Sequence, residues 1–341
     1  MEFTMKEQHP YRATIPPVPE GEPRPLWSVM IPTYNCANYL RETLASVLAQ
    51  DPGLEAMQIE VVDDHSTKDD PAAMVEELGR GRVNFYRQPE NVGYIRNFET
   101  CLQRSRGKLI HLLHGDDCVR DGFYRKIQQL FEQNPEVGAT FCRHIYMDEQ
   151  GHWQAISSLE EPKSGILNNW LERIVVDHLI QTPSIVVRRN VYEKLGGFDH
   201  RFTCVCEDWE MWVRIAANYP IAYEVEPLAI YRIARLGSLS KISIRSGKYA
   251  REVFQAHEII QSYLCDYLPQ DSANKFLSRS REHSALNFLT IAQQMIDNGD
   301  IEAAIIQVKE ALNGSSSLKV SKKVGHVMLK AAKFQITAKF Q

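Results

Sequence analysis

An apolar segment that ends in a glycine and two aspartates carries the strongest chemical signal in this chain. It covers residues 108–117 and reads Lys-Leu-Ile-His-Leu-Leu-His-Gly-Asp-Asp. A short apolar run bounded by turn residues is typical of a buried strand in a parallel sheet, and ligands of open α/β sheets bind at the carboxyl ends of such strands. Asp116 and Asp117 could hold a divalent cation against a diphosphate there, because Mg²⁺ takes one or two carboxylates together with phosphate oxygens. Glycine and aspartate also form ordinary turns, so the segment alone leaves both interpretations open.

Three further segments place polar residues where elements are expected to begin or end. Residues 29–35 end in Pro-Thr-Tyr-Asn, residues 59–66 contain Asp63 and Asp64, and residues 91–97 form a glycine-containing loop that leads into a helix. If the sheet is parallel, the strand ends near residues 32, 63 and 114 open on the same edge. Their polar groups would then converge on one crevice.

Strand and helix patterns alternate along the first half of the chain, which predicts right-handed βαβ units and a parallel sheet covered by helices. The expected strands are 27–32, 58–62, 83–87 and 108–114, and the expected helices are 39–50, 70–78 and 94–106. Further along, the patterns predict a helix at 122–134, a hairpin of strands 137–147 and 152–156, a strand at 184–187, a helix at 209–218 and two short strands around Pro227.

Taken in order, these motifs resemble the family 2 glycosyltransferases, which are inverting nucleotide-sugar enzymes of the GT-A fold. The resemblance covers residues 26–241. The residues that carry it are Pro32–Asn35, Asp63–Ser66, Asn91–Asn97, Gly115–Asp117, Cys206–Trp209, Tyr231–Arg232 and Gly237–Ser240. It implies an α/β fold with a mostly parallel, Rossmann-like central sheet flanked by helices, followed here by a C-terminal helical extension.

The resemblance also implies a nucleotide site. Asp64 would accept a hydrogen bond from the base imide, which favours UDP- or dTDP-sugars as donors. Ordinary alternatives remain: Asp64 could be a turn or capping aspartate, with Ser66 and Asp69 as further caps for the next helix, and Arg96 could be a surface arginine. The nucleotide-binding residues implied by the resemblance are Pro32, Thr33, Tyr34, Asn35, Asp64, Arg96 and Asp116.

Two aspartates receive catalytic roles from the same resemblance. Asp117 would ligate Mn²⁺ or Mg²⁺, which acts as a Lewis acid on the leaving diphosphate. Asp208 would be the base that deprotonates the acceptor hydroxyl, as inversion at the sugar carbon requires. Its neighbour Glu207 would raise its proton affinity, while Trp209 and Trp212 would exclude water. Acidic residues are also favoured at a helix N-terminus for electrostatic reasons alone, and the two interpretations are compatible.

One position departs from the family pattern. The family often has a histidine two residues after Tyr-Arg, and this chain has Ala234 there. Arg235, Ser238 and Ser240 could hold the diphosphate instead, because a fixed guanidinium charge can replace a metal ligand. Of the two histidines on the strand before the aspartates, His114 is expected to approach the site and His111 to lie in the core.

The ends of the chain differ in character from this central region (26–243). Residues 1–25 are rich in proline and read as an extended leader that does not pack. Residues 244–341 are helical; within them 285–312 resemble one tetratricopeptide-type hairpin, a region through which copies could associate. The segment 315–341 has six lysines and no acidic residue. A basic amphipathic helix can lie on an anionic bilayer, although a solvated helix docked on its own chain has the same pattern.

Bulk composition limits the function classes. The 341 residues carry a net charge of −4, which disfavours a general nucleic-acid binder. No apolar run approaches the length of a membrane span, and the seven scattered cysteines form no Cys-x-x-Cys pair, so a cytoplasmic location is expected. A peripheral position on the inner face of the cytoplasmic membrane is the alternative.

The sequence therefore predicts a metal-dependent, inverting glycosyltransferase. It would move a sugar from a nucleoside-diphosphate donor to a hydroxyl of a glycan or lipid-linked saccharide, in bacterial cell-surface polysaccharide synthesis. The alternative from another class is a non-catalytic nucleotide- or partner-binding module on a degenerate GT-A fold, which Ala234 alone favours. A nucleotidyltransferase would need a glycine-rich basic loop after the first strand, and a dehydrogenase would need Gly-x-Gly-x-x-Gly there. Neither is present.

Overall fold

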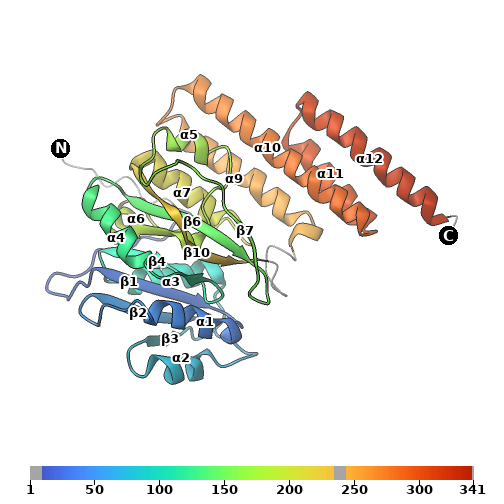
Figure 1. Cartoon of the computed structure of the whole chain (residues 1–341). Helices are drawn as coiled ribbons and strands as arrows, with labels where there is room; N and C mark the ends of the chain where they lie inside the picture. Colours follow the sequence, from blue (N-terminus) through green and yellow to red (C-terminus); the bar gives the residue numbers. More distant parts are fainter. Residues whose placement is uncertain (1–9, 234–242, 340–341) are drawn as a thin grey trace. The chain divides into compact units, whose positions relative to one another are not determined.

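The computed structural model describes residues 10–233 and 243–339 (Figure 1). The chain divides into two compact units. The sheet unit comprises Met1–Asn168, Ile180–Arg201 and Arg214–Ala234, and the helical unit comprises Asn169–Leu179, Phe202–Val213 and Arg235–Gln341.

The sheet unit is built on one mixed sheet, in which the strand order is β3-β2-β1-β4-β9-β6-β10-β5. The expected parallel arrangement is confirmed for β3, β2, β1 and β4 and for the pair β6–β10, whereas β9 runs antiparallel to both of its neighbours. The strands are β1 (Trp27–Thr33), β2 (Met57–Asp63), β3 (Asn84–Arg87), β4 (Leu109–Leu112), β5 (Cys118–Val119), β6 (Ala139–Met147), β7 (Trp153–Ile156), β8 (Gly165–Ile166), β9 (Ile185–Arg188) and β10 (Ile221–Arg232).

Helices connect the parallel strands, as the alternating pattern predicts. In this unit they are α1 (Ala37–Leu48), α2 (Pro71–Gly79), α3 (Tyr94–Arg104), α4 (Phe123–Gln133), α6 (Arg189–Leu195) and the 3₁₀ turn η1 (Thr182–Ser184). The core lies between β1, β2, α1 and α4, with fully buried side chains such as Val29, Ile31, Leu40 and Phe123. Burying each such side chain stabilises the fold by about 1.5–3 kcal/mol.

The caps of the first helices differ from the expectation. Asp70, not Ser66 or Asp69, caps α2: its Oδ1 accepts a hydrogen bond from the N–H of Ala73 at 3.1 Å. Asp69 turns back to α1, where its Oδ2 accepts from the N–H of Ala37 at 2.7 Å. A capping side chain must lie directly before the first turn, and that position belongs to Asp70 because Pro71 begins the helix.

The proline-rich leader is extended, but the prediction that it does not pack is wrong. Ile15 is 2% exposed, and the carbonyl oxygen of Ala13 accepts from the N–H of Gly197 at 2.8 Å. The guanidinium of Arg189 also donates to the carbonyl oxygen of Pro16. One apolar side chain and a few backbone hydrogen bonds are enough to fix an extended segment on the surface, and proline content alone does not reveal them.

Two short strands were expected around Pro227, and the structure has one long strand there. β10 runs from Ile221 to Arg232, and its pairing with β6 shifts register on both sides of Pro227. A β-bulge accommodates the missing proline N–H without ending the strand. The strand therefore continues to Arg232.

The helical unit contains α5 (Trp170–Ile174), the N-terminal part of α7 (Glu207–Asn218), α9 (Lys248–Leu264), α10 (Gln270–Asp297), α11 (Ile301–Gly314) and α12 (Leu318–Lys339). The expected helical hairpin is confirmed as α10 and α11, which pack together after a three-residue turn (Figure 1). Asp300 caps α11 by accepting from the N–H of Ala303, and the small buried Ala303 and Ala304 allow close packing.

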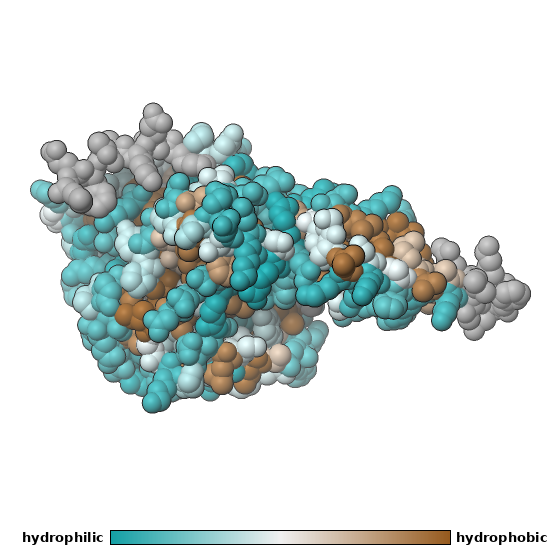
Figure 2. Space-filling view, turned by 90° about the horizontal axis from the view of Figure 1, so that it is seen from above, coloured by the Kyte–Doolittle hydropathy of each residue, from teal (hydrophilic) through white to brown (hydrophobic). Residues whose placement is uncertain are grey.

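The basic helix α12 packs against α10 on one side and exposes apolar residues on another. Lys319 and Lys330 form ion pairs with Glu282 and Asp297 of α10. Figure 2 shows apolar surface near the C-terminal residues, and the exposed apolar side chains of α12 are Leu318, Met328, Leu329 and Phe334. Within the described ranges, no helix is both long and apolar enough to cross a membrane.

Candidate active site

The predicted convergence of strand ends is confirmed in the sheet unit. Thr33 at the end of β1 pairs with Asp63 at the end of β2, and the N–H of Asp64 donates to the carbonyl oxygen of Thr33 at 2.9 Å. The chain after β4 meets the same edge, because the N–H of Gly115 donates to the carbonyl oxygen of Pro32 at 3.0 Å. The Pro-Thr-Tyr-Asn, Asp-Asp and Gly-Asp-Asp motifs therefore lie together.

This close approach favours glycine at position 115. A Cβ atom there would lie 3.1 Å from both the Oγ1 of Thr33 and the Sγ of Cys36. Both contacts are tighter than ordinary van der Waals distance, so a side chain would push the aspartate turn away from β1. The glycine thus fixes where Asp116 and Asp117 lie.

Asp64 is buried and anchors the loop that precedes α3. Its Oδ1 accepts from the N–H of Val92 at 2.8 Å, and its Oδ2 accepts from the N–H of Gly93 and the Nδ2 of Asn91, both at 3.1 Å. Burial raises the pKa of Asp64, and the two backbone hydrogen bonds only partly offset this effect. The sequence alternatives did not include this loop-anchoring contact, and hydrogen bonding to a base stays a prediction.

The remaining nucleotide-site candidates of the sheet unit differ in burial. Pro32 and Thr33 are buried, whereas Tyr34 is 45% exposed and presents an aromatic face to solvent. Asn35 joins two loops: its N–H donates to the Oγ of Ser66 at 2.8 Å, and its Oδ1 accepts from the N–H groups of residues 67 and 68. Arg96 is exposed in the first turn of α3.

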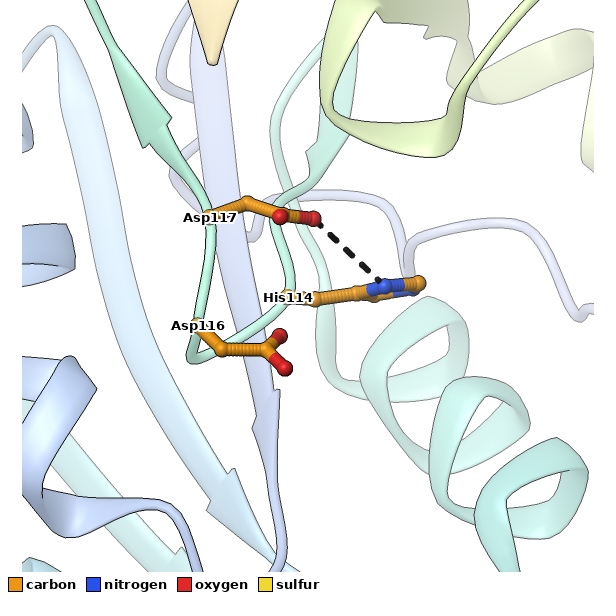
Figure 3. Close-up of side chains that lie close together, drawn as sticks. All are labelled: His114, Asp116 and Asp117. Atoms are coloured by element: carbon orange, nitrogen blue, oxygen red, sulfur yellow. Dashed lines mark ion pairs between the residues drawn. The ribbon is translucent and has the colours of Figure 1, made fainter. Parts of the chain in front are cut away.

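A cluster of three residues that could bind a metal ion follows β4. His114, Asp116 and Asp117 each offer a ligand atom, and these atoms lie within 4.8 Å of one another. Figure 3 shows the three side chains directed toward a common space, with the Nδ1 of His114 3.8 Å from the Oδ2 of Asp117. The ring of His114 stacks on Phe98 at 5.0 Å, which fixes its orientation. The expectation that His114 approaches the site is confirmed.

His111, three residues earlier, lies in the core as expected. It is fully buried, and its ring nitrogens lie 3.2 Å from the hydroxyl of Tyr124 and 3.0 Å from the carbonyl oxygen of Pro183. Burial lowers the pKa of His111 to about 4. It is therefore a neutral structural residue.

Arg232 at the end of β10 holds the aspartate turn. Its N–H donates to the Oδ1 of Asp117 at 2.9 Å, and its Nε donates to the carbonyl oxygen of Asp116 at 3.0 Å. The guanidinium is 1% exposed, lies 4.6 Å from the ring centre of Tyr39 and pairs with Glu42 at 2.8 Å. Arg232 belongs to a motif of the sequence, but no role for it could be predicted from the sequence alone.

The donor set of this cluster fits a hard divalent cation. Carboxylate oxygens suit Mg²⁺ and Mn²⁺, and these ions keep open positions for phosphate oxygens and water. Asp116 and Asp117 supply two carboxylates on one turn, and His114 adds one nitrogen, a ligand that was not predicted from the sequence. Asp117 is 1% exposed, so its charge acts in a region of reduced solvent screening.

Asp208 lies in the first turn of α7 in the helical unit and is 9% exposed. Its Oδ1 accepts from the N–H of Trp209 at 2.7 Å, and its Oδ2 lies 3.2 Å from the Nε2 of His178. Trp209, Trp212 and Glu207 are all buried, and their expected effect on the proton affinity of Asp208 stays a prediction. His178 was missed because it is 30 residues away and stands in no motif.

Glu252 of α9 holds the loop that leads into α7. Its carboxylate accepts from the backbone N–H groups of Thr203, Cys204 and Val205 at 2.9–3.2 Å and from the hydroxyl of Thr203. Burial acts to raise the pKa of Glu252, but these hydrogen bonds outweigh it and the net shift is downward. The sequence offered no signal for this contact, which joins two distant segments. The expected diphosphate residues Arg235 and Ser238, like Ala234 and Ser240, lie outside the described residues.

Comparison with known proteins identifies the fold class and then the family. The chain has the fold of GT-A glycosyltransferases: it aligns with TarS residues 1–349 of S. aureus in complex with UDP-GlcNAc (TM-score 0.62, 15% identity, 90% of this chain and 88% of that one). It also aligns with the mannosyltransferase PcManGT of Pyrobaculum calidifontis in complex with GDP-Man and Mn²⁺ (TM-score 0.56, 16% identity, 97% and 87%).

Sequence comparison gives the family itself. Residues 28–196 match the model of glycosyl transferase family 2, and the chain belongs to that family. An uncharacterized glycosyltransferase of Haemophilus influenzae is 26% identical over 223 residues, which cover 61% of this chain and 66% of that protein. The chain thus spans slightly less than two thirds of this relative.

Proposed function

We propose that this protein is a metal-dependent, inverting glycosyltransferase that uses a UDP- or dTDP-sugar. The observation that carries the proposal is the cluster of His114, Asp116 and Asp117 at the strand edge where the family motifs converge. Two carboxylates and an imidazole on one turn form a cation site open to a diphosphate. Both aligned structures hold a nucleotide sugar, and that of the mannosyltransferase also holds Mn²⁺, which supports this assignment.

The donor half of the reaction belongs to residues of the sheet unit. Asp64 would accept the imide N–H of uracil or thymine, while Thr33 and Tyr34 would line the nucleoside and Arg96 would reach the nucleotide. Asp116 and Asp117, with His114, would hold Mn²⁺ or Mg²⁺. When bound, the ion supplies Lewis-acid stabilisation to the diphosphate leaving group. Arg232 keeps these carboxylates in place, because it bonds both the Asp116 carbonyl oxygen and the Asp117 carboxylate.

The acceptor half requires a base. Asp208 would accept the proton of the acceptor hydroxyl while that oxygen forms a bond to the anomeric carbon and the bond to the diphosphate breaks. The transition state has oxocarbenium character, as in glycoside hydrolysis. Burial beside two tryptophans limits water around the carboxylate, so its interaction with a proton is little screened.

The acceptor is proposed as a hydroxyl of a glycan or lipid-linked saccharide in bacterial cell-surface polysaccharide synthesis. A lipid-linked acceptor would be reached by peripheral contact with an anionic membrane through α12, whose exposed Leu318, Met328 and Leu329 lie on a helix with six lysines. Two of these, Lys319 and Lys330, pair with acids of α10, which leaves fewer to face a membrane. Deletion of residues 315–341 should abolish sedimentation with anionic liposomes; unchanged sedimentation would contradict the membrane contact.

Turnover distinguishes this function from a non-catalytic binding module. The purified protein is incubated with Mn²⁺ and, in separate reactions, with UDP-, dTDP- and GDP-sugars, and release of free nucleoside diphosphate is followed by ³¹P NMR. Slow release from a uracil or thymine nucleotide sugar, lost in Asp117→Asn, supports a transferase that uses water in place of its acceptor. Binding without release from any donor, also after addition of glycan acceptors, would favour the binding module.

A further inference from the structure

A histidine outside the sequence motifs contacts the candidate base. The Nε2 of His178 lies 3.2 Å from the Oδ2 of Asp208, and its ring stacks on Trp209 with centroids 6.4 Å apart and an interplanar angle of 25°. The second oxygen of Asp208 accepts from the N–H of Trp209 at 2.7 Å. The carboxylate is therefore held at both oxygens, one by the helix backbone and one by this imidazole.

His178 is itself fixed by the surrounding segment. The Nε1 of Trp209 donates to the carbonyl oxygen of Ile174 at 2.7 Å, and the Oγ of Ser280 donates to the carbonyl oxygen of Val176 at 3.0 Å. These contacts tie the chain just before His178 to α7 and α10. The backbone that carries His178 is thus held by two hydrogen bonds from different helices.

The groups around His178 favour its charged form. Asp208 and Glu207 of α7 and Asp177 of its own segment are acidic. On α10, His283 pairs with Asp177 at 3.3 Å, and Arg281 adds a positive charge. On α9, the buried His257 is a further titratable group of the same unit. Burial acts to lower the pKa of His178, but the carboxylates, first among them Asp208, outweigh it and raise the pKa.

We propose that His178 is a positioning residue for catalysis, which orients the Asp208 carboxylate and whose charge sets the proton affinity of that carboxylate. The inference rests on the proposed function, in which Asp208 is the base. With His178 charged, Asp208 stays ionised at lower pH. When His178 loses its proton as the pH rises, the carboxylate becomes a stronger acceptor for the hydroxyl proton. The proton of the acceptor still passes to Asp208, and His178 gives up nothing in the transfer step.

The pH profile of transfer tests this role. In His178→Gln a polar amide stays beside Asp208 but carries no charge, so the acid limb of kcat/KM should move upward by about one pH unit. His283→Gln is the matched control, because it removes a histidine–aspartate pair of the same unit that does not include Asp208. Its acid limb should coincide with that of the wild type. A His178→Gln profile that coincides with the wild type would overturn the inference.

NMR titration of the histidines measures the interaction between His178 and Asp208 without any turnover. The pKa of His178 should fall by about one unit or more in Asp208→Asn, because the neutral amide removes the attraction of the carboxylate. An unchanged pKa would overturn the inference. If the wild type transfers sugar and the pH profile of His178→Gln coincides with it, only this inference is contradicted. If the wild type transfers sugar from no donor, the proposed function is contradicted, and the role of His178 with it.

Discussion

The backbone N–H of Arg232 donates to the Oδ1 of Asp117 at 2.9 Å, across 115 residues of sequence. The same residue bonds the carbonyl oxygen of Asp116 through its side chain, so the end of β10 supports both carboxylates of the candidate cation site. The buried guanidinium also donates to the carbonyl oxygens of Asp148 and Glu149 and to the carboxylate of Glu42.

Arg232→Ala should therefore weaken both the fold and the cation site. Loss of the buried guanidinium leaves several acceptors without a donor, and we expect the free energy of unfolding to fall by about 2–4 kcal/mol. Denaturant unfolding measures this change. Arg120→Ala is the control, because that exposed arginine also bonds a carbonyl oxygen of β10, at Pro227. Equal small losses in both variants would contradict the supporting role of Arg232.

Asp117→Asn should reduce nucleotide affinity in Mn²⁺ by at least about tenfold, since an amide replaces a charged ligand of the cation. In EDTA the variant and the wild type should bind equally weakly. Calorimetry with UDP measures both conditions, and Asp121→Asn, an exposed aspartate four residues away, is the control. If Asp117→Asn retains the Mn²⁺-dependent gain in affinity, Asp117 is not a ligand.

Asp208→Asn should lower kcat by about 10²–10⁴-fold, the range for loss of a general base. Its affinity for nucleotide should stay within about twofold of the wild type, because Asp208 is proposed to act on the acceptor and not on the donor. Steady-state kinetics and calorimetry on the same preparation separate the two effects. Parallel loss of turnover and affinity would remove Asp208 as the base.

Glu252→Gln should destabilise the protein in a pH-dependent way. The pKa of Glu252 is below its usual value of 4.5, so its contribution is present above that pH and is lost as the pH falls through the folded-state pKa. We expect the variant to be less stable by about 2 kcal/mol at pH 7 and by a smaller amount at pH 3. Chemical unfolding at both pH values measures this, with Glu258→Gln on the exposed face of α9 as control. A difference that is the same at both pH values would refute the charge-based explanation.

Sequence periodicity was sufficient for the parallel strands β1 to β4 with their connecting helices and for the local motifs. β1, β2 and β4 were predicted because each is an apolar run followed by turn residues, and the meeting of their ends at Thr33, Asp63 and Gly115 follows from parallel pairing alone. The antiparallel insertion of β9 was not predicted, because a strand of four residues carries no sign of its partner or direction.

The contacts that support the site were harder to predict, because they join residues far apart in sequence. His178 with Asp208, and Glu252 with Thr203–Val205, pair ordinary residue types that match no local pattern. The functions assigned to Asp64 and Asn35 illustrate the converse. Both stand in recognisable motifs, yet the contacts they make within the chain organise loops, and these contacts became visible only in three dimensions.

Calorimetric titration of UDP into the wild-type protein, with Mn²⁺ and again with EDTA, tests the central claim most directly. Titrations of dTDP, GDP and CDP under the same two conditions measure which base the protein prefers. The proposed function predicts Mn²⁺-dependent binding of UDP or dTDP and weak binding of GDP and CDP. Binding that is equally strong in EDTA, or no binding of any of the four nucleotides, would contradict a metal-dependent transferase that recognises a uracil or thymine nucleotide.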